Sequence, residues 1–132
     1  MVNSNDSLSS VGQRPHKKLL LWQEAMELVV HIYELTKVFP REEEFGLKSQ
    51  LRRASVSVVS NIAEGLARKT KNDKLHFLNI SQASLSEIDT QIEISLRLNY
   101  ISSTVFDAMG QQIMKIQKLL SGLNRNVERR EK

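Results

Sequence analysis

The sequence predicts an all-α protein, folded as an up-down-up-down antiparallel four-helix bundle. Four segments repeat apolar residues at spacings of three and four, which is typical of amphipathic helices. The connections between these segments are short, and short connections make consecutive helices antiparallel. The chain of 132 residues has only two prolines and five glycines to interrupt its helices. A long three-helix arrangement is the alternative that these observations leave open.

The first helix is expected at about 18–39. Its inward stripe consists of Leu21, Ala25, Leu28, Ile32, Leu35 and Phe39. A second apolar stripe lies beside the first and consists of Trp22, Met26, Val29 and Tyr33. The apolar arc is therefore wider than one neighbouring helix would cover. Pro40 ends this helix, because proline disrupts a helix at an interior position.

The second helix is expected at about 41–67, with Pro40 at its start and a run of glutamates near the positive end of the helix dipole. Its inward stripe consists of Leu47, Leu51, Ala54, Val58, Asn61 and Gly65. Gly65 and the polar run ARKTKND that follows it predict the end of this helix.

The third helix is expected at about 72–99 and the fourth at about 103–129. Thr70 or Asn72 would cap the third helix and Ser102 or Ser103 the fourth, because such side chains accept hydrogen bonds from the first N–H groups of a helix. The inward faces are Leu78, Leu85, Ile88, Ile92 and Leu96, and then Phe106, Met109, Ile113, Ile116, Leu120, Leu123 and Val127. The bundle is thus expected to occupy residues 17–132 as one domain.

Residues 1–16 are expected to form a flexible polar tail, because they are rich in serine and asparagine and lack the apolar core of a secretory signal. No apolar run approaches the roughly eighteen residues of a membrane span. The absence of cysteine excludes disulfides, cysteine–zinc sites and thiol catalysis. These observations favour a soluble, cytoplasmic protein with no membrane partner.

Antiparallel order should bring three cationic segments to one end of the bundle, which we call the basic pole. The segments contain Arg14, His16, Lys17 and Lys18, then Arg68, Lys69, Lys71 and Lys74, and finally Arg125, Arg129, Arg130 and Lys132. Eleven Lys or Arg residues and three acids give this end +8, although the whole chain carries +4. Helix capping explains part of the set, but not Lys17 and Lys18, which lie near a helix N-terminus where cations are unfavourable. The basic pole is therefore a candidate site for phosphate contacts with nucleic acid, with RNA as the favoured partner.

The stretch SVVSNIAEG at 57–65 places polar residues on a helix that should bury an apolar face. Our hypothesis is a structural polar network, in which Arg53 pairs with an acid of the third helix and the serine and asparagine bond across the same interface. The network would consist of Arg53, Ser60, Asn61, Glu64 and Glu87. The alternative is a ligand or RNA pocket around Asn61 and Glu64.

No catalytic set is present in the sequence. The three histidines, His16, His31 and His76, lie in separate segments, and none has a partner at metal-ligand spacing, so we expect no metal and no cofactor. The sequence also lacks a phosphate-binding glycine loop and a GxSxG motif. A tight bundle offers little room for an active-site cleft, so we expect no enzymatic activity.

An ordered set of motifs resembles one protein family. The motifs are Phe39-Pro40, Phe45-Gly46-Leu47, Gln50-Leu51-Arg52-Arg53-Ala54, Ser60-Asn61-Ile62-Ala63-Glu64-Gly65 and Ser84-Leu85-x-Glu87. Over about 20–123 the chain resembles the four-helix-bundle proteins encoded in intervening sequences of bacterial 23S ribosomal RNA, which are related to the accessory variability proteins of diversity-generating retroelements. The resemblance implies a homopentamer. It also implies a basic surface, through which the retroelement relatives bind a reverse transcriptase and nucleic acid.

Two functions from different classes remain open. The first is a non-enzymatic, oligomeric accessory protein that binds nucleic acid through the basic pole. Its sequence specificity should be weak, because few aromatic side chains near the pole could stack on bases. The second is a protein–protein scaffold, or an accessory subunit of an enzyme such as a reverse transcriptase, with no direct nucleic-acid role.

Overall fold

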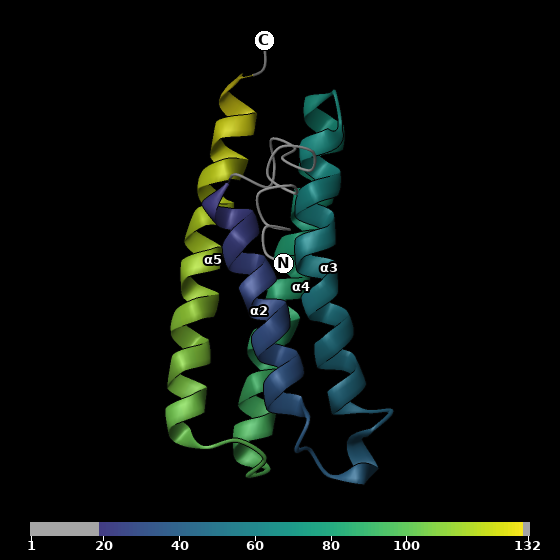
Figure 1. Ribbon diagram of the computed structural model, residues 1–132. Helices are drawn as coiled ribbons and strands as arrows, with labels where there is room; N and C mark the ends of the chain where they lie inside the picture. The colour runs from purple at the N-terminus through teal and green to yellow at the C-terminus, as the bar shows by residue number, and fades with distance from the viewer. Residues whose placement is uncertain (1–18, 131–132) are drawn as a thin grey trace, which may run out of the picture.

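The computed structural model describes residues 19–130, and over that range the protein has four α-helices and no strand. The helices are α2 (Leu20–Thr36), α3 (Leu47–Ala67), α4 (Lys71–Arg97) and α5 (Ser103–Arg130), with a short 3₁₀ helix, η2 (Arg41–Glu43), before α3. The helices run alternately up and down, side by side (Figure 1). The predicted all-α antiparallel four-helix bundle is confirmed. The polar tail predicted at 1–16 lies outside the described residues.

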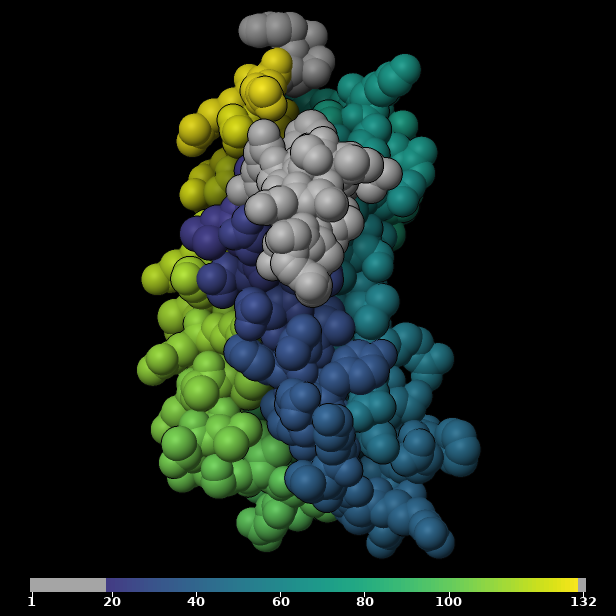
Figure 2. Space-filling view, in the orientation of Figure 1, coloured from purple at the N-terminus to yellow at the C-terminus, as the bar shows by residue number. Residues whose placement is uncertain are grey.

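The four helices occupy the corners of a square in cross-section. α2 packs on α3 and α5, and α4 packs on the same two helices, so α2 and α4 lie at opposite corners. Figure 2 shows one face of the molecule, with α2 seated between α3 and α5. The α2–α3 face and the α4–α5 face are therefore opposite sides of the bundle.

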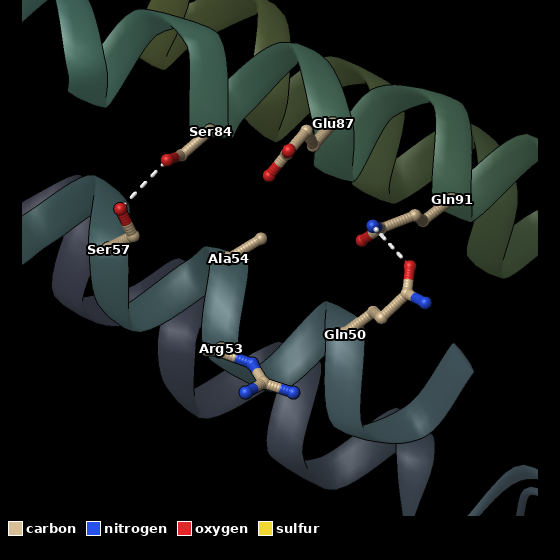
Figure 3. A pocket seen from close by; sticks show the side chains of 7 residues that line it. All are labelled: Gln50, Arg53, Ala54, Ser57, Ser84, Glu87 and Gln91. Atoms are coloured by element: carbon tan, nitrogen blue, oxygen red, sulfur yellow. Dashed lines mark hydrogen bonds between the residues drawn. The ribbon is translucent and has the colours of Figure 1, made fainter. Parts of the chain in front are cut away.

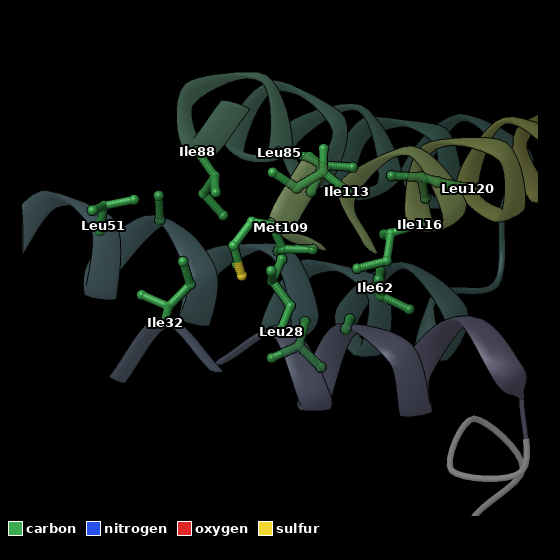
Figure 4. Close-up of a cluster of buried hydrophobic side chains, with 14 of the residues drawn as sticks. Leu28, Ile32, Leu51, Ile62, Leu85, Ile88, Met109, Ile113, Ile116 and Leu120 are labelled. Carbon is green, nitrogen blue, oxygen red and sulfur yellow. The ribbon is translucent and has the colours of Figure 1, made fainter. Parts of the chain in front are cut away.

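The core runs through the centre of the square and receives apolar side chains from every helix (Figure 4). The fully buried large side chains are Leu28, Ile32, Leu51, Val58, Ile62, Leu78, Leu85, Ile88, Ile92, Ile113, Ile116 and Leu120. Each such side chain stabilises the fold by about 1.5–3 kcal/mol relative to an exposed one. The predicted stripes supply nearly all of this core. Five residues of the predicted stripes are only half-buried, namely Leu35, Asn61, Leu96, Phe106 and Leu123.

The connection between α2 and α3 differs from the prediction of a continuous helix from 41. Glu43 Oε1 accepts the Leu47 N–H at 2.9 Å, and its other oxygen, Oε2, accepts from Tyr100 Oη at 2.9 Å. A Cβ on Gly46 would lie 2.8 Å from Glu43 Oε1, so this arrangement requires glycine there. The glutamate thus serves as the N-terminal cap of α3, and α3 begins at Leu47.

The end of α2 also differs from the prediction, since the helix stops at Thr36 and not at Phe39. The guanidinium of Arg52, on α3, donates to Thr36 Oγ1 at 2.9 Å and to the Tyr33 backbone oxygen at 3.2 Å. It also lies 4.4 Å from the centroid of the Tyr33 ring. A cation on the last carbonyls of a helix complements the negative end of its dipole, so Arg52 terminates α2.

Of the cap residues predicted for the two later helices, Thr70 caps α4 and Ser102 caps α5. Thr70 Oγ1 accepts the Asp73 N–H at 3.1 Å, and Ser102 Oγ accepts the Val105 N–H at 3.1 Å. α4 ends in a Schellman motif, because Asn99 has a φ of 63° and the following N–H of Tyr100 reaches back to the Ser95 oxygen at 2.8 Å.

α3 ends at Ala67, as the sequence predicted, and Gly65 lies buried in its last turn. A Cβ at this position would lie 3.1 Å from the Lys74 backbone oxygen and 3.2 Å from the Leu78 side chain. The glycine therefore allows α3 and α4 to approach closely near the turn that joins them.

Candidate nucleic-acid interface

The connection between α3 and α4 and the last turns of α5 lie at the same end of the bundle (Figure 1). Lys71 Nζ donates to the Glu128 backbone oxygen at 3.5 Å, a contact that joins segments 57 residues apart in sequence. The described members of the basic pole are Arg68, Lys69, Lys71, Lys74, Arg125, Arg129 and Arg130. The predicted members Arg14, His16, Lys17, Lys18 and Lys132 lie outside the described residues.

Besides Lys71, two cations of the basic pole have structural partners. Arg68 forms an ion pair with Glu64, and its guanidinium lies 4.8 Å from the centroid of the Phe77 ring. Lys74 Nζ donates to the Leu66 backbone oxygen at 3.4 Å. These contacts satisfy the C-terminal end of α3, so Arg68 and Lys74 stabilise the turn between α3 and α4.

Four other cations of the pole are exposed, namely Lys69, Arg125, Arg129 and Arg130. Within residues 19–130, none of them forms a hydrogen bond or an ion pair. These side chains are exposed and form no ion pair with a carboxylate of residues 19–130, so they are available to an anion.

The N-terminus of α4 lies among these cations. A shallow hollow there is lined by Lys69, Thr70, Lys71 and Asn72. The first N–H groups of a helix carry partial positive charge, and they favour phosphate groups. The positive potential of the helix end therefore adds to that of the two lysines. Asp73, in the first turn, reduces this potential by one negative charge.

The hydrogen bonds of the predicted polar network remain within α3. Arg53 Nη2 donates to Ser49 Oγ at 3.0 Å, and its guanidinium points away from α4 (Figure 3). Asn61 Nδ2 donates to the backbone oxygen of Ser57 at 2.8 Å and to its Oγ at 3.1 Å. The prediction that Arg53 pairs with an acid of the third helix is thus corrected, because its guanidinium finds an acceptor one turn earlier on its own helix.

The other members of that network are separate from one another. Ser60 and Glu87 are exposed. Glu64 pairs with Arg68, at the basic pole. The five residues therefore do not form a connected set in the structure.

Other serines form hydrogen bonds between α3 and α4. Ser81 Oγ, which is fully buried, donates to the Val58 backbone oxygen at 2.7 Å, and Ser57 Oγ lies 2.8 Å from Ser84 Oγ. Sequence reasoning missed Ser81, although a signal was present. Ser81 lies on the inward stripe of α4, three residues after one buried leucine and four before the next.

A polar groove of about 470 Å³ runs between α3 and α4 on the outer surface (Figure 3). Its lining consists of Gln50, Arg53, Ala54, Ser57, Ser84, Glu87 and Gln91. Gln91 Nε2 donates to Gln50 Oε1 at 3.3 Å across it, and Gln91 Oε1 is buried without a hydrogen-bond partner. Neither Asn61 nor Glu64 lines this groove, so it is distinct from the alternative pocket considered for those residues.

Within residues 19–130, no group of three or more histidine, aspartate or glutamate side chains is placed to hold a metal ion. His31 Nδ1 lies 2.9 Å from Gln112 Oε1, and its Nε2 lies 3.6 Å from a Glu27 oxygen, so it helps to join α2 to α5. No helix in the same range is long and apolar enough to cross a membrane.

The fold and the charged end define a small four-helix-bundle protein with a cationic pole. The family model described as 23S rRNA-intervening sequence protein matches residues 17–122, so the chain belongs to that family. A crystal structure of a protein of unknown function from the S23 ribosomal protein family of Bacteroides thetaiotaomicron has the same fold, with a TM-score of 0.74 and 22% sequence identity. The match covers 80% of this chain and 96% of that one. No curated protein matches this chain.

The family's name refers to an intervening sequence of 23S ribosomal RNA and to no enzymatic activity. The Bacteroides protein is described as one of unknown function, and its likeness to this chain shows the fold alone. The relation to the variability proteins of retroelements stays a prediction from the sequence motifs.

Proposed function

We propose that this chain is a non-enzymatic, oligomeric accessory protein of the cytoplasm that binds RNA through the basic pole. One observation carries the proposal: the contact between Lys71 and the Glu128 backbone oxygen brings two cationic segments together at one end. Both segments carry exposed cations that form no ion pair within the part of the chain that the structure describes. The family's association with ribosomal RNA supports RNA as the polyanion.

The binding mode should be contact with backbone phosphates, with weak sequence specificity. The aromatic side chains near the pole are already engaged, since Phe77 lies under Arg68 and the His76 ring stands edge-on to it at 4.9 Å. Base stacking on these rings would require the loss of those contacts. Charge neutralisation by the exposed arginines and lysine needs no such rearrangement.

The oligomeric part of the proposal is supported by apolar side chains on the outside of the bundle. Met26, Val30 and Tyr33 lie on one face of α2 and are 38%, 52% and 39% exposed. Exposed apolar surface of this kind is typical of a subunit interface. The resemblance in the sequence motifs indicates a homopentamer.

A second function is supported by a different observation. Phe45, in the connection before α3, is 94% exposed, and a phenylalanine in that position is typical of a contact with another protein. In this alternative the chain is a protein–protein scaffold, and its partner is a protein such as a reverse transcriptase.

The salt dependence of RNA affinity tests the first function. The variant replaces the four cations without structural partners by alanine, at Lys69, Arg125, Arg129 and Arg130. The affinity falls with salt, and each phosphate contact contributes about 0.7 to the steepness of log K against log salt. The variant loses four such contacts, so its slope between about 50 and 200 mM salt should be less steep by about 2 to 3. Fluorescence anisotropy with a labelled single-stranded RNA gives both slopes.

The matched control replaces four cations far from the pole by alanine, at Lys37, Arg41, Arg97 and Lys115. This control has the same net charge as the variant but should keep the wild-type slope. Equal losses in both proteins would show that only net charge matters and would refute the pole as the site. An absence of RNA binding by the wild-type chain at about 50 mM salt would leave the scaffold as the function.

A further inference from the structure

The Phe45 side chain stands on an unusual surface. Around it lie the exposed apolar side chains of Tyr33 and Val56, on the outer face of α2 and α3. The same surface includes the cations Lys48, Arg52 and Arg53 and one carboxylate, Glu44, which pairs with Lys48, so the surface keeps a net positive charge. We call this surface the Phe45 face. A group of exposed apolar side chains rimmed by charged ones is typical of a surface that a partner covers.

The charges of the Phe45 face restrict what can cover it. Two copies of the face, placed against each other about a two-fold axis, would bring two surfaces of net positive charge together, with Arg52 and Arg53 on each side. Like charges across an interface disfavour such pairing. A matching surface should therefore combine apolar side chains with carboxylates.

The α4–α5 face of the same chain has this character. A groove of about 410 Å³ there is lined by Asp89, Phe106, Asp107, Gly110, Gln111, Ile113, Met114 and Gln117, and we call it the Gly110 groove. A Cβ on Gly110 would meet no atom within 4 Å, and Met114 is 54% exposed. Asp89 and Asp107 are both exposed, and neither forms an ion pair within residues 19–130.

The two surfaces also match in height along the bundle. α3 and α5 both begin at the end of the bundle opposite the basic pole (Figure 1). At 1.5 Å per residue, Arg53 lies about 9 Å along α3 from its first residue, and Asp107 lies about 6 Å along α5 from its own. Two copies placed side by side with parallel axes would therefore bring these charges to a similar level.

We propose that the Phe45 face of one copy docks into the Gly110 groove of a second copy. The contact is heterologous, because the two surfaces lie on opposite sides of the bundle, so each copy can bind two neighbours. Phe45 supplies the apolar anchor, and Arg53 faces the carboxylates of the groove. Every copy in such an array keeps its basic pole at the same end. The inference rests on the oligomeric part of the proposed function and supplies its contact surfaces.

Charge reversal tests the contact in the full-length chain. Arg53→Asp and Asp107→Arg should each abolish self-association, since each places like charges across the interface. A mixture of the two variants should associate again. The aspartate at position 53 of one then meets the arginine at position 107 of the other, while their unchanged surfaces pair as in the wild type. Light scattering during size-exclusion chromatography, at about 100 µM protein, gives the molar mass of each variant and of the mixture.

Two further variants separate this interface from general effects. Phe45→Ser should weaken self-association at least about tenfold, because it removes the apolar anchor. Arg97→Asp has the same charge change as Arg53→Asp at a site outside both surfaces, and it should keep the wild-type mass. Circular dichroism spectra confirm that each variant is folded.

The possible failures are distinguishable. A wild-type chain that is monomeric at this concentration would overturn the assembly as a whole. A wild-type oligomer whose mass is unchanged in both charge variants, or a mixture that stays monomeric, would overturn only this contact. RNA binding by a single basic pole is measured separately, with a strand too short to reach two poles, and depends on neither result.

Discussion

Among single side chains, Gly65 has the clearest structural requirement. Alanine at this position would gain about 1 kcal/mol of helix propensity. Its Cβ would also press on the Lys74 backbone oxygen, 3.1 Å away, and overpacking of this kind costs about 1–3 kcal/mol. A backbone oxygen cannot move aside as a flexible side chain can. We therefore expect Gly65→Ala to lower the free energy of unfolding by about 1 kcal/mol, measured by urea denaturation.

Gly122 is the matched control, because it also lies inside a helix. A Cβ there would have its nearest neighbour, Arg125 Nη2, at 3.9 Å, an ordinary contact. Gly122→Ala should raise the free energy of unfolding by about 0.5–1 kcal/mol. If both substitutions stabilised the protein, the close approach of α3 and α4 at Gly65 would not be a constraint.

At the level of helices and their ends, the hydrogen bond between Tyr100 and Glu43 joins the end of α4 to the start of α3. This bond, followed by desolvation and the charges of Glu43 and Glu42, raises the pKa of Tyr100 above its ordinary value of 10.0. The neutral phenol is thus favoured in the folded state. Its contribution to stability is complete below the unfolded pKa and is lost as the pH rises through the raised folded pKa.

The alkaline absorbance titration of the tyrosines tests this prediction. Tyr33→Phe leaves Tyr100 as the one tyrosine of the chain and keeps a ring beneath Arg52. In that background Tyr100 should titrate above 10.0, and the further change Glu43→Ala should return its pKa toward that value. An identical titration in the two proteins would show that the hydrogen bond does not form in solution.

At the level of the whole molecule, apolar periodicity was enough to predict the four helices and most of the core. Burial of one helix face imposes a 3.6-residue period whatever the loops do. The start of α3 was not predictable in this way, because it depends on Tyr100, which lies 57 residues from Glu43 in the sequence. Pro40 and the following glutamates are equally compatible with a helix from 41 and with the observed turn.

In the candidate site, too, the placement of segments could be predicted but the partners of individual side chains could not. Antiparallel order predicted that the α3–α4 connection and the end of α5 would meet, and the contact of Lys71 with the Glu128 backbone oxygen confirms that placement. The partners of individual cations could not be predicted, because they depend on side-chain rotamers. Arg68 and Lys74 therefore proved to be engaged with α3, and Arg53 proved to bond to its own helix.

The two proposals together predict that assembly controls RNA affinity. Parallel copies present their basic poles on one side, so a long strand can contact several poles, and each later contact is intramolecular. The monomeric Arg53→Asp variant should then bind an RNA of about 60 nucleotides at least about 100-fold more weakly than the wild type. Both proteins should bind an RNA of about 10 nucleotides equally, because this strand reaches one pole only. Adding Asp107→Arg protein should restore the affinity for the long strand. Equal affinities of the monomeric and assembled proteins for the long strand would show that each pole acts alone.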